Sequence, residues 1–98
     1  MLELHLGAEG EVMMIGRLDA AECEAALRFL EALAEPRIID LGRLEYISSA
    51  GLRVLLLTQK RVKGSGGGIR LINVRPEIHD IFRYAGFDRI IEIDRAPG

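Results

Sequence analysis

The sequence predicts an α/β fold, in which a mostly parallel mixed sheet has an antiparallel hairpin at one edge and helices alternate with the later strands. Two observations support this prediction. Short apolar segments and segments with helical spacing follow one another in the order β-β-α-β-α-β-α-β, and strands separated by helices favour parallel pairing with right-handed crossovers. The length of 98 residues also suits one compact domain, which we assign to residues 1–98.

The hairpin is predicted from residues 2–7 and 11–18, which are joined by a short turn at residues 8–10. Leucines alternate with polar residues in the first segment, a pattern typical of an edge strand with one face toward solvent. Residues 12–15 are apolar without alternation, so we expect this part of the second strand to be covered on both faces.

The first helix is predicted to begin at Asp19, because Asp19 and Glu22 have the spacing of a capping box. Apolar residues follow at spacings of three and four, and Pro36 is expected to end the helix. Cys23 belongs to this apolar stripe, so we interpret it as a small core residue and not as a nucleophile. Because a lone cysteine cannot form an internal disulfide, we expect a reducing compartment and a cytoplasmic location.

The middle of the chain predicts a short buried strand at residues 37–41 and a second helix from about Ser49 to Lys63. The glycine-rich residues 64–68 come after this helix and before a strand, whereas a phosphate-binding loop lies between a strand and the helix that follows it. We therefore interpret this run as a helix cap and a turn.

The last third of the chain predicts a strand at residues 69–74, a third helix and a final strand at residues 89–93. Pro76 suits the first position of that helix, and Gly86 suits its C-terminal cap.

Composition argues against several classes of function. The net charge is −2, with 13 basic and 15 acidic residues and no Trp, so we expect no direct binding of nucleic acid. Lys60, Arg61 and Lys63 form the main basic cluster, and cations near the end of a helix are explained by its dipole. No apolar run approaches the roughly 18 residues of a membrane span, and no secretory signal is recognisable.

The segment from Ser48 to Gly51 lies where a strand passes into a helix, and such a junction can hold or receive a phosphate. Because ligands and partners of parallel sheets bind beyond the carboxyl ends of the strands, this junction is the candidate site. Asp19 and residues 73–75 also follow strands that precede helices. We therefore expect these segments to cluster at one end of the molecule.

Catalysis by these serines is not expected. The nucleophile elbow of hydrolases requires Gly-x-Ser-x-Gly, whereas Tyr46 and Ile47 precede the serine pair. The two histidines, His5 and His79, do not fall at the carboxyl end of a strand. No cluster of His, Cys, Asp or Glu has the spacing of metal ligands. We therefore expect no enzymatic activity, no cofactor and no metal site.

A purely structural role is the main alternative that the residues themselves leave open. Ser48 or Ser49 could be an N-cap that contributes about 1 kcal/mol, and one hydroxyl is enough for a cap. Gly51 lies one turn into the helix, where glycine costs roughly 0.5–1 kcal/mol relative to alanine. Its missing side chain would permit another chain to approach closely.

The segment from Asp40 to Leu55, which ends in Tyr-Ile-Ser-Ser-Ala-Gly-Leu-Arg-Val-Leu, resembles the signature of STAS domains. It is especially similar to the bacterial anti-sigma-factor antagonists of that family. Residues 16–19, Gly-Arg-Leu-Asp, resemble a second element of the family at the end of the second strand. The order of elements agrees as well, so the resemblance extends over residues 2–93.

The resemblance also implies a site. In the family, an aspartate usually precedes the hydroxyl residue that receives phosphate, so Ser49 is the expected acceptor and Ser48 stands in place of the aspartate. Ser48 remains the alternative acceptor, because it supplies a competing hydroxyl. The expected partner-binding residues are Asp19, Ser48, Ser49, Ala50, Gly51, Leu52 and Arg53.

The function that the resemblance implies is partner switching. The unphosphorylated form would bind an anti-sigma factor that is also a serine kinase of the histidine-kinase-like ATPase fold. Serine phosphorylation would release it, and a serine phosphatase would restore binding, which regulates transcription or a related output. Two alternatives remain, namely a STAS subunit that docks constitutively in a signalling or lipid-transport complex and a STAS domain that senses a nucleotide or another small molecule.

Overall fold

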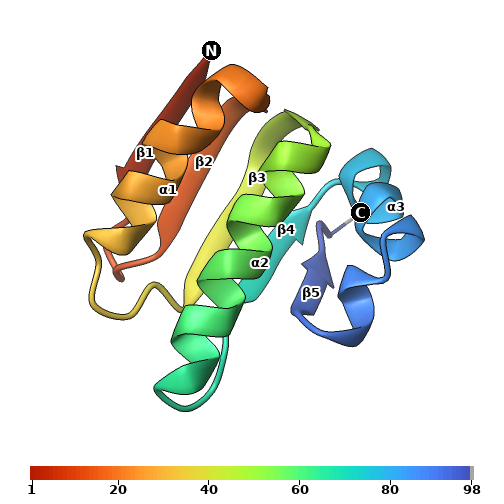
Figure 1. The fold of residues 1–98 in the computed structure, drawn as a ribbon. Helices are drawn as coiled ribbons and strands as arrows, with labels where there is room; N and C mark the ends of the chain where they lie inside the picture. The colour runs from red at the N-terminus through yellow and green to blue at the C-terminus, as the bar shows by residue number, and fades with distance from the viewer. Residues whose placement is uncertain (98) are drawn as a thin grey trace.

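Among residues 1–97, five strands form one sheet in the order β1-β2-β3-β4-β5 (Figure 1). The structure, a computed structural model, describes residues 1–97. Strand β1 is antiparallel to β2, and each later pair of neighbours is parallel. This arrangement confirms the predicted α/β class with a hairpin at the sheet edge. The strands span Leu2–Leu6 (β1), Val12–Leu18 (β2), Ile38–Ile47 (β3), Arg70–Val74 (β4) and Glu92–Arg95 (β5).

In the part of the chain that the structure describes, three helices and two short 3-10 turns connect the strands. Figure 1 shows α1 and α2 side by side across one face of the sheet, with α1 over the hairpin and α2 over β3 and β4. Since neighbours in the parallel part of the sheet follow sequence order, right-handed crossovers place successive helices on the same face. The helices are α1 (Cys23–Glu31), α2 (Ser49–Gly64) and α3 (Pro76–Tyr84), and the turns are η1 (Ala20–Glu22) and η2 (Phe87–Arg89).

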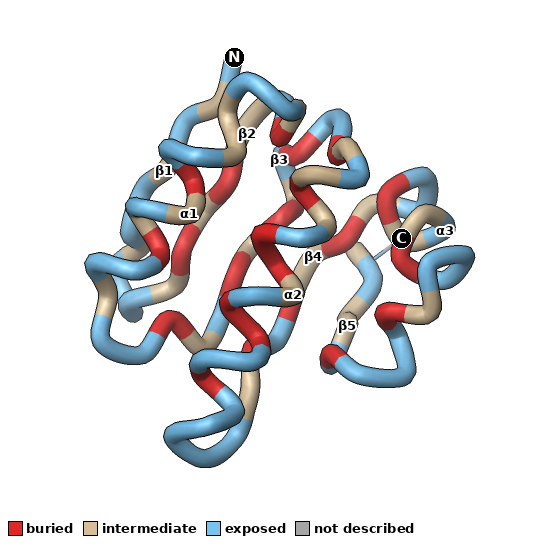
Figure 2. Tube along the Cα trace, viewed as in Figure 1, coloured by how far each residue is buried: buried red, intermediate tan, exposed pale blue. Residues whose placement is uncertain are grey.

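The core lies between the sheet and the helices, where buried positions of β2, β3 and α2 face one another (Figure 2). In β2, Val12 and Met14 are buried, whereas Met13 and Ile15 are only half-buried. The expectation that residues 12–15 are covered on both faces is therefore wrong, because α1 and α2 pack on one face of the sheet. The opposite face holds the alternate positions of each strand.

Strand β3 is longer than predicted. It extends to Ile47, because β2 pairs with it as far as the partners Leu18 and Ile47. Two irregularities in this pairing shift the register, and they interrupt the alternation of β3 side chains between the two faces of the sheet. In sequence, the segment after Leu41 therefore resembles a polar loop, although Leu44 and Ile47 within it are buried.

Two further boundaries differ from the prediction. Helix α1 ends at Glu31, ahead of Pro36, and η1 precedes it. Strand β5 begins at Glu92, because residues 87–89 form η2. The buried Phe87 stacks there on Phe82 of α3, with ring centroids 5.9 Å apart, so this segment adds to the core as a turn.

Candidate functional site

Ser48 is the N-cap residue of α2. Its backbone is extended, with φ −88 and ψ 171, and its Oγ accepts a hydrogen bond of 3.1 Å from the N–H of Gly51. The same hydroxyl donates to the carbonyl oxygen of Leu18 at 3.2 Å, and the Ser48 N–H donates to that oxygen at 3.0 Å. The Ser48 hydroxyl therefore both caps α2 and connects the start of this helix to the end of β2.

Ser49 is the first residue of α2 and is exposed. Its hydroxyl forms no hydrogen bond with any of residues 1–97. It lies at the positive end of the helix dipole, beside backbone N–H groups that have no partner within the helix. Of the two adjacent hydroxyls, the one on Ser49 is accessible for modification.

Gly51 is buried in the first turn of α2. A Cβ atom at this position would lie 2.8 Å from both the Leu18 carbonyl oxygen and the Ile47 Cγ1 atom. Ordinary Cβ contacts are longer than 3.0 Å. The close approach that glycine permits is therefore made by this chain's own β2 and β3, and the glycine is explained by packing within the domain.

Asp19 lies beside this junction but does not form the predicted capping box. It is the N-cap of η1, and its side chain makes no capping hydrogen bond. The Glu22 N–H instead donates to the Asp19 carbonyl oxygen at 3.1 Å. Among the described residues, the Asp19 Oδ1 atom is buried without a hydrogen-bond partner. A 3-10 turn at this point moves the carboxylate away from the N–H groups that a capping box would use.

Cys23 packs against the same junction, which the sequence pattern did not indicate. Its Sγ donates to the Asp19 carbonyl oxygen at 3.1 Å, and Ser48 is near enough to hydrogen-bond the thiol. Burial raises the pKa of the Cys23 thiol, the Ser48 hydrogen bond opposes this, and the Asp19 charge adds to the rise. The thiol is therefore protonated at neutral pH and is a poor nucleophile.

The other expected partner-binding residues lie on the first turns of α2. Ala50 and Leu52 are half-buried, and Arg53 is exposed. Together with Ser49 they form a small surface of mixed apolar and basic character at the N-terminal end of the helix.

The segment 73–75 does not join this cluster. The Asn73 amide donates to the Asp40 carboxylate at 3.0 Å, and Arg75 Nε donates to the Gly42 carbonyl oxygen at 3.0 Å. These partners belong to the middle of β3, and β3 continues to Ile47 before the chain reaches Ser48. The expected cluster of three segments is therefore reduced to two.

Arg17 and Tyr46 also lie next to the junction, and the sequence interpretation did not include them. The Arg17 guanidinium carbon is 4.3 Å from the centre of the Tyr46 ring, and the two residues are register partners in β2 and β3. Tyr46 is 37% exposed. The pair is far apart in sequence, and the register shifts within β3 hide the pairing from a pattern-based prediction.

The histidines lie elsewhere in the fold. His5, on the edge strand, is 3.5 Å from Glu3, and His79 lines a hollow formed by Pro76 and the chain that follows β5. Within residues 1–97, no group of three or more His, Cys, Asp or Glu side chains is placed to hold a metal ion. The described helices also include none that is long and apolar enough to cross a membrane.

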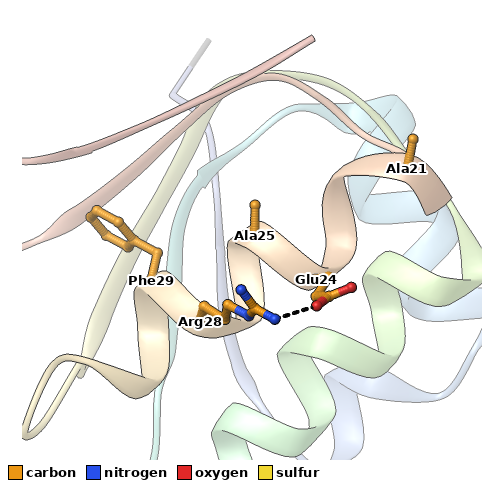
Figure 3. A pocket seen from close by; sticks show the side chains of 5 residues that line it. All are labelled: Ala21, Glu24, Ala25, Arg28 and Phe29. Carbon is orange, nitrogen blue, oxygen red and sulfur yellow. Dashed lines mark hydrogen bonds and ion pairs between the residues drawn. The ribbon is translucent and has the colours of Figure 1, made fainter.

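A wide hollow runs along the outer side of η1 and α1 (Figure 3). Ala21, Ala25 and Phe29 form its apolar part, and Glu24 and Arg28 pair with each other beside it. All five side chains come from one continuous stretch of chain. Among the described residues, no polar group from another element lines the hollow, so it lacks the arrangement of a catalytic pocket.

Comparisons with known proteins agree on one family. A family model described as "Mlab, STAS domain" matches residues 4–92. A protein of Bordetella bronchiseptica, provisionally named anti-sigma factor antagonist BtrV, is 37% identical over 81 residues. That match covers 82% of this chain and 70% of the relative.

Solved structures share the fold at lower identity. SpoIIAA, described as an anti-sigma factor antagonist in its unphosphorylated form, matches with a TM-score of 0.71 and 19% identity, over 95% of this chain and 87% of that one. A STAS domain protein of Planctomyces limnophilus matches with a TM-score of 0.74 and 22% identity, over 97% and 89%. The chain therefore belongs to the STAS domain family, and its relatives group it with the anti-sigma-factor antagonists.

Proposed function

We propose that this protein is an anti-sigma-factor antagonist whose binding is switched by phosphorylation of Ser49. In this proposal, the unphosphorylated protein binds an anti-sigma factor that is also a serine kinase of the histidine-kinase-like ATPase fold. Phosphate transfer from ATP in the kinase releases the protein, and a serine phosphatase restores it. The chain itself catalyses nothing and acts in the cytoplasm.

One observation supports Ser49 as the acceptor more than any other. The Ser49 hydroxyl is exposed and unbonded within residues 1–97, whereas the Ser48 hydroxyl both accepts from Gly51 and donates to Leu18. A kinase that used Ser48 would have to break both hydrogen bonds and the cap of α2. Phosphorylation of Ser49 leaves the cap intact.

The same geometry accounts for the serine that stands where the family usually has aspartate. Position 48 is an N-cap, and serine and aspartate are about equally good caps because each offers an oxygen to a free backbone N–H. The substitution therefore keeps the structural role of the position. It removes one negative charge next to Ser49 and leaves the acceptor where it was.

A phosphate on Ser49 suits the fold of this domain. The group adds about −1.5 to −2 charges, and at a helix N-terminus the dipole favours negative charge by about 0.3–1 kcal/mol. The phosphate would therefore not unfold α2. At an interface it would have to be desolvated, and each 1.4 kcal/mol of that penalty weakens binding about tenfold. We infer a local block of binding without refolding.

Mass spectrometry of the protein after incubation with its kinase and ATP tests the acceptor. The kinase to use is a serine kinase of the histidine-kinase-like ATPase fold that binds this protein in a pull-down. We expect one added phosphate on the native protein and on Ser48→Ala, and none on Ser49→Ala. A phosphate that remains in Ser49→Ala, or that disappears in Ser48→Ala, would overturn the assignment. No phosphate on any form would favour constitutive docking.

A further inference from the structure

The C-terminal half of α2 forms one wall of a hollow that the proposed switch does not use. Leu56, Gln59, Lys60 and Lys63 line it from α2, and Ile90 lines it from the chain after η2. Its volume is ≈ 190 Å³, somewhat more than the roughly 150 Å³ of a protein cavity that holds benzene. The hollow is therefore large enough for one apolar side chain of a partner.

Gln59 holds the two walls together. Its Nε2 donates to the Ile90 carbonyl oxygen at 2.8 Å, and its Oε1 accepts from the Ile69 N–H at 2.8 Å. Gln59 is itself only 8% exposed. The backbone of Ile90 is thereby fixed to α2, although the Ile90 residue remains 50% exposed. Because the hollow already exists in the unbound protein, binding of a partner costs little free energy of reorganisation.

The charge around the hollow is entirely positive on its α2 side. The sequence has no Asp or Glu between Glu45 and Glu77. Arg61 is occupied, because its guanidinium donates to the carbonyl oxygens of Leu30 and Leu33. Lys60 and Lys63 are exposed, and none of the ion pairs among residues 1–97 includes either of them. A protein with net charge −2 thus presents two unpaired ammonium groups beside an apolar hollow.

We propose that this hollow is a second docking site, which binds an acidic amphipathic segment of a partner protein. One apolar side chain of the segment would enter between Leu56 and Ile90, and its carboxylates would meet Lys60 and Lys63. The charge complementarity and the preformed apolar contact together match the way that an amphipathic helix binds in a groove.

A narrow peptide fits this surface better than an anionic membrane does. α1 lies beside α2 on the same face of the sheet (Figure 1), and its Glu24 and Glu31 are exposed. A flat anionic surface that reached Lys60 and Lys63 would also approach these carboxylates and be repelled by them. A single peptide segment bound along the hollow would contact the two lysines without approaching the carboxylates of α1.

The site lies away from the proposed switch. Leu56 and Lys63 are seven and fourteen residues after Ser49, which at about 1.5 Å per residue places them roughly 10 and 21 Å along the helix. Exposed charges are screened over about 8 Å at physiological ionic strength. Binding at the hollow is therefore independent of the charge on Ser49, and the inference goes beyond the proposed function.

Titration of the ¹⁵N-labelled protein with two synthetic helical peptides tests this site. One peptide has leucines on one face and glutamates elsewhere, and the other has lysines in place of the glutamates. We expect amide shifts at Leu56, Gln59 and Ile90, with the acidic peptide binding at least tenfold tighter than the basic one. Ser49→Asp should bind the acidic peptide within twofold of the native protein, even if the proposed switch is wrong.

Matched variants separate the site from general charge effects. The double variant Lys60→Glu and Lys63→Glu should lower the affinity for the acidic peptide at least tenfold. Arg43→Glu, at an exposed position of β3, should leave that affinity within twofold of the native value. Equal affinity for both peptides, shifts confined to another surface, or no shifts at millimolar peptide would overturn the inference. So would lysine-dependent binding of phosphatidylglycerol vesicles without binding of the peptide.

Discussion

The adjacent hydroxyls of Ser48 and Ser49 differ in what they bind, and this difference predicts unequal effects on stability. Ser48→Ala removes the cap of α2 and should lower the free energy of unfolding by about 1 kcal/mol. Ser49→Ala removes an exposed hydroxyl without a partner in residues 1–97 and should change it by less than about 0.5 kcal/mol. Urea denaturation of both variants measures this, and equal losses would contradict the assignment of the cap.

Gly51 is expected to be intolerant of even the smallest side chain. In Gly51→Ala the new Cβ would meet the Leu18 carbonyl oxygen and Ile47, so the start of α2 has to move. Overpacking of this kind costs about 1–3 kcal/mol, which for a domain of this size lowers the midpoint of thermal unfolding by roughly 4–8 °C per kcal/mol. An unchanged midpoint would show that α2 is not packed closely against β2.

Cys23 should react slowly and should make stability fall at high pH. Because burial raises the pKa of its thiol above 9.0, the folded protein holds this proton more tightly than the unfolded chain does. The resulting stabilisation is complete below about pH 9 and is lost as the pH rises through the folded pKa. Alkylation by iodoacetamide at pH 8 should be slower in the native protein than in guanidinium, and equal rates would contradict this account.

At the scale of the elements, alternation and helical spacing predicted the type of every main element, but boundaries were missed where tertiary contacts decide them. The extension of β3 depends on pairing with β2 through two register irregularities, which no local pattern reveals. η2 exists because Phe87 is buried against Phe82. The capping box predicted from Asp19 and Glu22 failed because the chain there forms a 3-10 turn.

Gln59 connects α2 to the residue before β4 and to the residue after η2, so its loss should affect these segments together. Gln59→Leu has a similar size but leaves the Ile69 N–H and the Ile90 carbonyl oxygen without their present partner. An unsatisfied buried group costs about 1–3 kcal/mol, so we expect a loss of about 2–3 kcal/mol in guanidinium denaturation. Hydrogen exchange at the Ile69 amide should accelerate at the same time. An unchanged exchange rate would contradict the role of Gln59.

For the whole molecule, the sequence predicted the family and the fold class better than the contacts around the two serines. The motif around Ser48 and Ser49 was sufficient for the family, because its residues are contiguous. The contacts of Ser48 with Leu18 and Cys23 join distant parts of the chain, and they separate the two serines in a way that spacing alone cannot. The basic cluster at the end of α2 was visible in the sequence, but its pattern did not show that Arg61 is occupied by carbonyl oxygens of Leu30 and Leu33.

The two proposed surfaces divide α2 into a switchable N-terminal end and a permanently basic C-terminal end. Ser49 is at the first and Lys60 and Lys63 are at the second. Such a division would allow one partner to be released by phosphorylation while another stays bound. A phosphate on Ser49 is screened by salt from the ammonium groups of Lys60 and Lys63.

The affinity of the cognate anti-sigma factor for the unphosphorylated and the Ser49-phosphorylated protein tests the central claim most directly. Isothermal titration calorimetry gives the two affinities, and thermal unfolding of the same samples reports on the fold. Our account predicts at least tenfold weaker binding after phosphorylation, with the unfolding midpoint unchanged within about 2 °C, because the helix dipole tolerates the phosphate. Equal affinities, or a midpoint that collapses on phosphorylation, would contradict it.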